Sequence, residues 1–142
     1  MLTCQKTFKD IPWAHRLHKH DGPCAFIHGH NWDITLTFGC NAPEANGFVV
    51  DFGKLDFIER WIAQYLDHAC VFNADDPLRE KLIAAAPQAW KPYIVDSCSS
   101  EGMAKHLYDT LAPLVRQNTQ GRVFIVRVEI AEDKLAKATY GA

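Results

Sequence analysis

CAFIHGHNWD, residues 24–33, places a cysteine and two histidines just before an alternating apolar and polar pattern. The alternation continues through residues 31–39 and predicts a half-buried strand. Its apolar face consists of Trp32, Ile34, Leu36 and Phe38. Because residues i and i+2 of a strand point to the same side, His28 and His30 aim two imidazoles at one point. The pair is either half of a metal site or two surface histidines.

Outward from this stretch, the periodicity predicts one α+β domain over residues 1–142. Strands are expected at residues 2–9, 31–39, 48–52 and 122–132, and helices at residues 53–68, 78–86 and 99–117. The remaining segments, 10–30 and 69–77 among them, are expected to be irregular. Because strands and helices do not alternate strictly, the order favours helices over one face of an antiparallel sheet. Pro113 is expected to kink or shorten the last helix.

The composition excludes several classes of protein. The chain has 142 residues, 48% of them hydrophobic and 23% charged, with a net charge of −2. No basic run indicates a nucleic-acid partner, and no apolar stretch approaches the roughly 20 residues of a membrane span. The first residues lack the apolar core of a signal peptide, so we expect a cytoplasmic protein. Five widely spaced cysteines and no CxxC pair predict reduced thiols rather than a disulfide framework.

Histidines are concentrated in residues 15–30, which contain five of the seven. His15 follows the apolar pair Trp13-Ala14, so it is expected to point inward and to join His28 and His30. Three histidines with an open position are typical of catalytic zinc. His18 and His20 are rival ligands, although their polar neighbours favour a solvated loop.

Cys24 has three possible roles. It is a small buried hydrophobe, a further metal ligand, or a reactive thiol that needs a neighbouring base or positive charge. Asp67 and His68, in the stretch LDHAC, are the candidate partners for a reactive thiol. Alternatively, His68 is a charge at the C-terminal end of the first long helix, where the helix dipole favours a cation.

Glu132 continues the face of the last predicted strand that carries Phe124, Val126, Val128 and Ile130. A buried carboxylate without a partner is costly, so this position predicts a cation or the N–H groups of a ligand. Alternatively, the strand ends there and leaves Glu132 in solvent. Ser99 or Ser100 is expected to cap the helix that follows.

The ordered motifs WAHRL, CAFIHGHNW, DFGKL, LDH, SSE and EIAED resemble the family of 6-pyruvoyl-tetrahydropterin and 6-carboxy-5,6,7,8-tetrahydropterin synthases. The resemblance extends from His15 to Tyr140. It implies the tunnelling fold, a four-stranded antiparallel sheet with two helices on one face. Three subunits then close a barrel and two trimers stack, with sites between subunits.

The resemblance also implies the site. Zn²⁺ would be held by His15, His28 and His30, and Cys24 would be the catalytic thiol rather than a ligand. Asp67 and His68 would act with that thiol in proton transfer. Glu132 would anchor the pterin ring, with help from Ser99.

The short spacing between Cys24 and His28 resembles the bacterial carboxy type. This implies a zinc-dependent lyase on the queuosine and deazapurine route, which converts 7,8-dihydroneopterin triphosphate to 6-carboxytetrahydropterin, acetaldehyde and triphosphate. Pyruvoyltetrahydropterin formation and an aldolase or epimerase activity are alternatives on the same fold. A non-catalytic, zinc-stabilised pterin-binding module is the alternative of another class. The segment 71–96 is longer than the corresponding segment of compact family members, so the resemblance does not decide the identity of the substrate.

Overall fold

The computed structural model describes all 142 residues, arranged as six strands and three α-helices. The strands are β1 (Leu2–His15), β2 (His28–Cys40), β3 (Ala69–Asn73), β4 (Pro92–Val95), β5 (Val123–Ala131) and β6 (Lys137–Gly141). The helices are α1 (Asp56–Tyr65), α2 (Arg79–Ala85) and α3 (Ser100–Asn118). The three predicted helices are confirmed, with α1 shorter at both ends. No helix combines the length and the apolar character that crossing a membrane requires.

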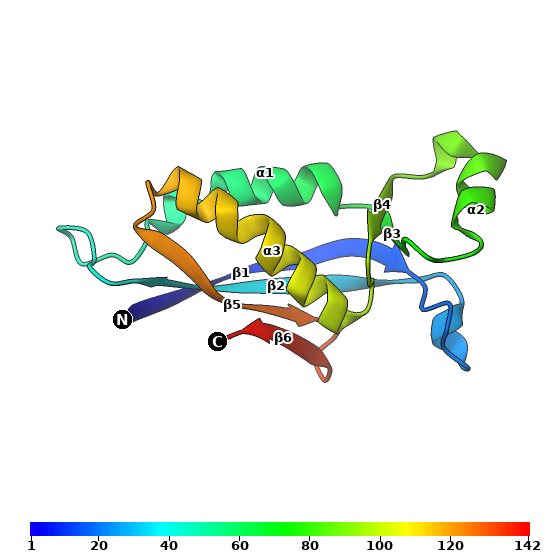
Figure 1. The fold of residues 1–142 in the computed structure, drawn as a ribbon, viewed down its shortest axis with the longest axis horizontal. Coiled ribbons are helices and arrows are strands. Elements are labelled where there is room, and N and C mark those ends of the chain that lie inside the picture. The colour runs from blue at the N-terminus through cyan, green and yellow to red at the C-terminus, as the bar shows by residue number, and fades with distance from the viewer.

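All six strands form one sheet in the order β4-β3-β1-β2-β5-β6 (Figure 1). The neighbours β1, β2, β5 and β6 pair antiparallel, whereas β3 and β4 extend the sheet in parallel. The sheet is therefore mixed and six-stranded, where the sequence predicted four antiparallel strands. A loop was expected over residues 69–77, but the first four residues of β3 are all buried. A strand without alternation gives no period-2 signal.

The hairpin of β1 and β2 is longer than the sequence predicted. Residues 10–30 were expected to be irregular, yet β1 continues to His15 and β2 already begins at His28. A register shift between Phe8 and Ile11 explains the difference, because it interrupts the alternation of β1. Asp10 lies at this bulge with a φ of 55°. The two strands therefore remain paired up to their histidine-bearing ends.

Two other strand predictions need correction. The segment 48–52 is not a strand, because it leads into a 3-10 helix at Phe52–Lys54 that Asp51 caps through Gly53 N–H. On β5 the buried residues are Val123, Ile125, Val128 and Ile130, so Phe124 and Val126 were assigned to the wrong face. A register shift between Thr37 and Phe38 of β2 reverses the alternation there.

Helices α1 and α3 cover the same face of the sheet (Figure 1). Their buried residues pack on the apolar face of β2 as one core. The helical part of this core consists of Ile58 and Ile62 of α1 with Met103, Ala104, Leu107, Leu111 and Val115 of α3. The expected alternating face of β2 is confirmed, since Trp32, Ile34, Leu36 and Phe38 are fully buried. Pro113 does not shorten α3, which continues to Asn118.

Candidate metal centre and adjoining pocket

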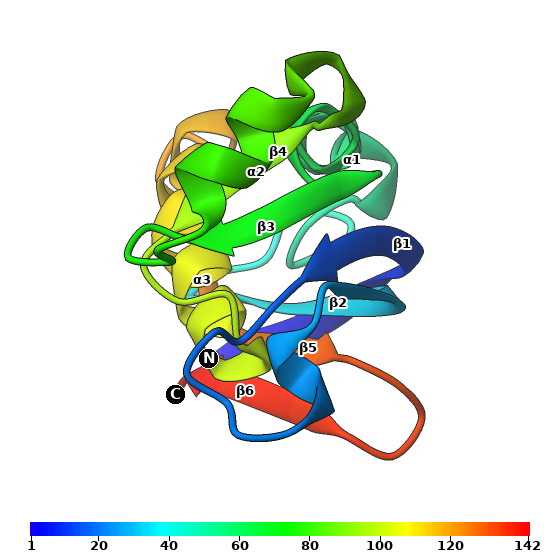
Figure 2. The same cartoon turned by 90° about the vertical axis from the view of Figure 1, so that its right-hand side faces the viewer.

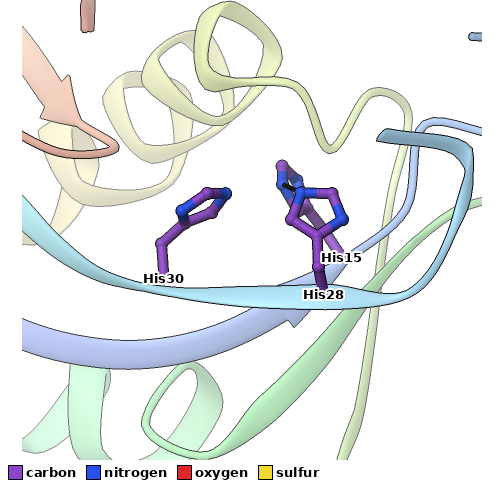
Figure 3. Close-up of side chains that lie close together, drawn as sticks. All are labelled: His15, His28 and His30. Atoms are coloured by element: carbon purple, nitrogen blue, oxygen red, sulfur yellow. Dashed lines mark hydrogen bonds between the residues drawn. The ribbon is translucent and has the colours of Figure 1, made fainter. Parts of the chain in front are cut away.

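The predicted histidines meet where the hairpin of β1 and β2 ends. His15 and His28 are directly paired across the two strands, and His30 lies two residues further along β2 on the same face. Figure 3 shows the three rings on one side of the strands. One ligand nitrogen from each ring lies within 4.8 Å of the others, a set of donors that could hold a metal ion. Figure 2 looks onto this end of the molecule, which also carries α2 and the loop between β1 and β2.

The hydrogen bonds of His15 and His28 fix which nitrogens face the centre. His15 Nδ1 lies 2.7 Å from the carbonyl oxygen of Cys98, and His28 Nδ1 lies 2.7 Å from that of Phe26. A carbonyl only accepts, so each Nδ1 carries a proton, and in the form of the ring that binds metal each Nε2 presents a lone pair. The two Nε2 atoms lie 3.1 Å apart. Two lone pairs at that distance repel each other unless a cation lies between them, so the geometry fits a metal ion.

His30 supports the same conclusion. Its Nε2 is a buried atom that has no hydrogen-bond partner. Glu132 Oε1 lies 3.1 Å away, but the angle does not make a hydrogen bond. A buried nitrogen is rarely without a partner. The unpaired Nε2 of His30, beside the two Nε2 lone pairs of His15 and His28, therefore fits a third ligand of a three-histidine metal site.

Burial and aromatic packing hold the rings in place. Burial lowers the pKa of His15, and the neighbouring His28 and His30 lower it further, against an opposing effect of the Cys98 carbonyl. A neutral imidazole is the form that binds metal. Trp32, fully buried, meets the rings of His15 and His30 edge-on and stacks on Trp13 with ring centroids 4.5 Å apart. The two indoles make a rigid floor beneath the donors.

Cys24 lies in a short 3-10 helix, Pro23–Ala25, and lines a pocket of about 160 Å³ beside the histidines. His15, His28, Ser99 and Glu132 line the same pocket. The Cys24 thiol is not among the grouped donor atoms. The arrangement therefore favours a thiol beside the metal site over a thiol within it.

Glu132 directly follows β5 and is half-buried rather than fully buried. Ser100 Oγ donates a hydrogen bond of 3.2 Å to Glu132 Oε2. Ser99 is the N-cap of α3, because its Oγ accepts from Gly102 N–H at 3.0 Å. The carboxylate thus has one protein donor and retains capacity for N–H groups of a ligand.

Asp67 and His68 lie elsewhere in the chain. They hydrogen-bond to each other, and the His68 side chain is 84% exposed. His68 lines a different pocket, with Gly29, His30 and Asn31, and has a left-handed φ of 62°. Within one chain, the structure does not bring this pair into the pocket of Cys24. The rival ligand His18 contacts Asn73 and Asp75 instead of the metal donors, and His20 accepts from Gly22 N–H.

Sequence reasoning missed the backbone carbonyls of Phe26 and Cys98, the Ser100 contact and Lys137 of the pocket. A carbonyl contact has no residue signature, so no pattern could reveal the first two. Lys137 begins β6, a five-residue strand whose pattern is too short to stand out. Only Ser100, next to the predicted cap, had a signal in the sequence.

Comparisons with known proteins show the family of the chain. The model of the family described as 6-pyruvoyl tetrahydropterin synthase matches residues 3–142. A protein named 6-carboxy-5,6,7,8-tetrahydropterin synthase from Rickettsia conorii is 27% identical over 121 residues, covering 83% of this chain and 87% of its own. One of the same name from Aquifex aeolicus is 27% identical, over 82% of this chain and 75% of its own.

Solved structures show the same fold. An uncharacterized protein from Wolinella succinogenes superposes with a TM-score of 0.82 at 20% identity, covering 99% of each chain. The 6-pyruvoyl tetrahydropterin synthase of Caenorhabditis elegans gives a TM-score of 0.68 at 19% identity, over 99% of this chain and 95% of its own. At these identities the likeness concerns the fold alone.

Proposed function

The chain belongs to the 6-pyruvoyl tetrahydropterin synthase family, and on that premise we propose that it is a zinc-dependent lyase of the 6-carboxytetrahydropterin type. Its substrate is 7,8-dihydroneopterin triphosphate and its products are 6-carboxy-5,6,7,8-tetrahydropterin, acetaldehyde and triphosphate. The atoms balance with one water molecule. The ring gains two hydrogens as the side-chain carbon becomes a carboxylate, so no external reductant is required. This reaction serves the queuosine and deazapurine route.

One observation carries the proposal: the three-histidine centre opens into the pocket that contains Cys24 and Glu132. His15, His28 and His30 would hold the ion through Nε2. When bound, zinc supplies Lewis acidity toward the side-chain oxygens of the substrate. The names of the curated relatives support the carboxy product.

The remaining residues bind the ring and move protons. Glu132 accepts N–H groups from the amino-pyrimidine edge of the pterin, and Ser100 holds the carboxylate that does so. Ser99 lies on the same wall and assists. Cys24 carries a proton between the side chain and the ring, a role that needs a partner base.

Asp67 and His68 provide that base from a neighbouring subunit. The pockets support this assignment, because within one chain His68 and Asp67 line pockets that do not include Cys24. The sheet supports assembly: β1 pairs with β3 only at residues 13–15, and β6 has a free outer edge. Unpaired edges of this kind favour pairing with another chain. We therefore propose a homo-oligomer, and the resemblance to the family implies that it is a dimer of trimers.

Product analysis tests the reaction. Purified protein loaded with zinc is incubated with 7,8-dihydroneopterin triphosphate, and the pterins and acetaldehyde are quantified. Acetaldehyde in equal amount to 6-carboxytetrahydropterin supports the proposal. A pyruvoyl product without acetaldehyde would instead establish the alternative that the family description names, and no turnover of any dihydropterin would favour a binding module.

A further inference from the structure

We propose that Asn73 is a positioning residue for the metal centre, and that it acts on His15 through Cys98. Asn73 is the last residue of β3, within the long segment 71–96, and does not line the pocket of Cys24. The inference rests on the proposed metal site, because His15 matters here as a ligand. It adds a residue that touches neither the ion nor the substrate.

Asn73 fixes the backbone of Cys98. Its Oδ1 accepts a hydrogen bond of 2.7 Å from Cys98 N–H. Its Nδ2 lies 3.2 Å from His18 Nδ1, which accepts from it and so holds the amide in this orientation. The Cys98 thiol donates to the carbonyl oxygen of Arg16 at 3.2 Å. Cys98 is fully buried, so no water is available to replace these partners.

Cys98 in turn fixes His15. Its carbonyl oxygen accepts the Nδ1 proton of His15 at 2.7 Å, which leaves Nε2 as the lone-pair nitrogen that faces His28 and His30. The partner of the second nitrogen sets the tautomer and orientation of a metal-binding histidine. The N–H group of Cys98 is thus held by the Asn73 side chain, and the carbonyl group of Cys98 holds the metal ligand His15.

Parallel pairing keeps the two ends of this connection in register. His15 of β1 pairs with Val71 of β3, two residues before Asn73. The two hydrogen bonds therefore link Asn73 at the end of β3 to Cys98 before α3, and Cys98 to His15 at the end of β1. Loss of the Asn73 acceptor leaves a buried N–H without a partner, so residue 98 is expected to shift and to carry its carbonyl away from His15.

The test measures metal binding rather than turnover. Full-length wild type, Asn73→Ala, Asn73→Leu and Asn73→Asp are titrated with Co²⁺, and the dissociation constant and the visible absorption bands are recorded. Asn73→Leu keeps the branching and the number of side-chain heavy atoms without an acceptor, and Asn73→Asp restores an acceptor oxygen. Glu80→Ala is the matched control, because Glu80 lies in the same segment, is exposed and contacts neither His18 nor Cys98.

We expect Asn73→Ala and Asn73→Leu to weaken Co²⁺ binding by about 10- to 100-fold and to shift the bands. Asn73→Asp and Glu80→Ala are expected to resemble wild type. Unchanged affinity and bands in a folded Asn73→Ala or Asn73→Leu protein would overturn the inference and leave the proposed function standing. Failure of wild type itself to bind Co²⁺ would overturn the metal site and the inference with it.

Discussion

At the residue scale, the metal centre depends on which nitrogen of each histidine is free to bind the ion. Backbone carbonyls occupy Nδ1 of His15 and His28, and Nε2 of His30 has no hydrogen-bond partner. The result is three inward-facing donors from two adjacent strands. A ligand set on paired strands is rigid, which suits the proposed catalytic site, where one coordination position would stay open for substrate.

Glu132 provides a prediction at this scale. Glu132→Gln removes the charge and replaces one acceptor oxygen with an amide donor. We expect the affinity for a reduced pterin to fall by about 10- to 100-fold, because a charge-assisted hydrogen bond contributes roughly 1.5–3 kcal/mol. Fluorescence titration with 6-carboxytetrahydropterin measures the change. Zinc content should match wild type, and an unaltered pterin affinity would remove Glu132 from the binding site.

The residue types of the site were largely predictable, whereas their supporting contacts were not. Strand geometry predicts that His28 and His30 share one side, and the apolar neighbours of His15 predict that it points inward. The structure brings all three together. The partners of their Nδ1 atoms belong to the backbone of Phe26 and Cys98, which no residue pattern specifies.

At the element scale, α3 begins at the wall of the pocket. Ser99 caps the helix through Gly102 N–H, and the next residue, Ser100, contacts Glu132. We expect Ser99→Ala to lower the free energy of unfolding by about 1 kcal/mol, which is the usual value of a lost cap. Urea unfolding measures this, with Ser100→Ala as the matched control that leaves the cap intact. Equal stability of Ser99→Ala and wild type would contradict the capping role.

The loop after β3 is joined to the loop after β1 by a buried ion pair. Arg16 contacts both carboxylate oxygens of Asp76 at 2.6 and 2.7 Å, and its Nη1 donates to Ala25 O beside Cys24. Asp76 has no exposed side-chain surface. The pair therefore connects the Cys24 segment to the long segment 71–96.

This ion pair predicts a pH dependence. Hydrogen bonds from Arg16 hold the pKa of Asp76 below its ordinary value of 3.8. A lowered pKa in the folded state means that the stabilisation is complete above the ordinary carboxyl range and is lost as the pH falls through the folded-state value. Asp76→Asn should therefore cost about 3 kcal/mol near neutral pH, because it leaves the buried guanidinium without its charge partner.

Urea unfolding of the metal-free protein at about pH 5 and pH 3 measures the difference. The gap between wild type and Asp76→Asn should narrow at the lower pH, because the unfolded wild-type chain takes up a proton on Asp76 there and folding must displace it. A gap that stays constant would show that Asp76 acts through packing alone. Glu80→Gln, at an exposed position of the same segment, serves as the control.

The elements that escaped prediction are the short or buried ones. Helices α1 and α3 have apolar stripes long enough to be seen, and β2 alternates cleanly over Trp32, Ile34, Leu36 and Phe38. By contrast, β3, β4 and β6 have four or five residues each. Their position depends on pairing with strands distant in the sequence, which local pattern does not encode.

At the scale of the whole molecule, Cys24 and His68 of the same chain line different pockets. If a neighbouring subunit supplies the second residue, two inactive variants complement each other. We expect Cys24→Ala and His68→Ala each to be inactive, and a co-refolded equimolar mixture to regain about a quarter of wild-type activity, since random assembly restores that fraction of shared sites. Turnover of the mixture measures it. An inactive mixture whose mixed assembly is confirmed by mass spectrometry would contradict shared sites.

The most direct test of the account compares metal content and turnover in wild type and Cys24→Ala. The geometry places the thiol in the pocket beside the three histidines, outside the grouped donor atoms. We predict that Cys24→Ala keeps its full zinc content while turnover of 7,8-dihydroneopterin triphosphate falls by about 10²- to 10⁴-fold, the range expected for loss of a proton-transfer group. Loss of zinc together with turnover would contradict the account, because Cys24 would then be a ligand.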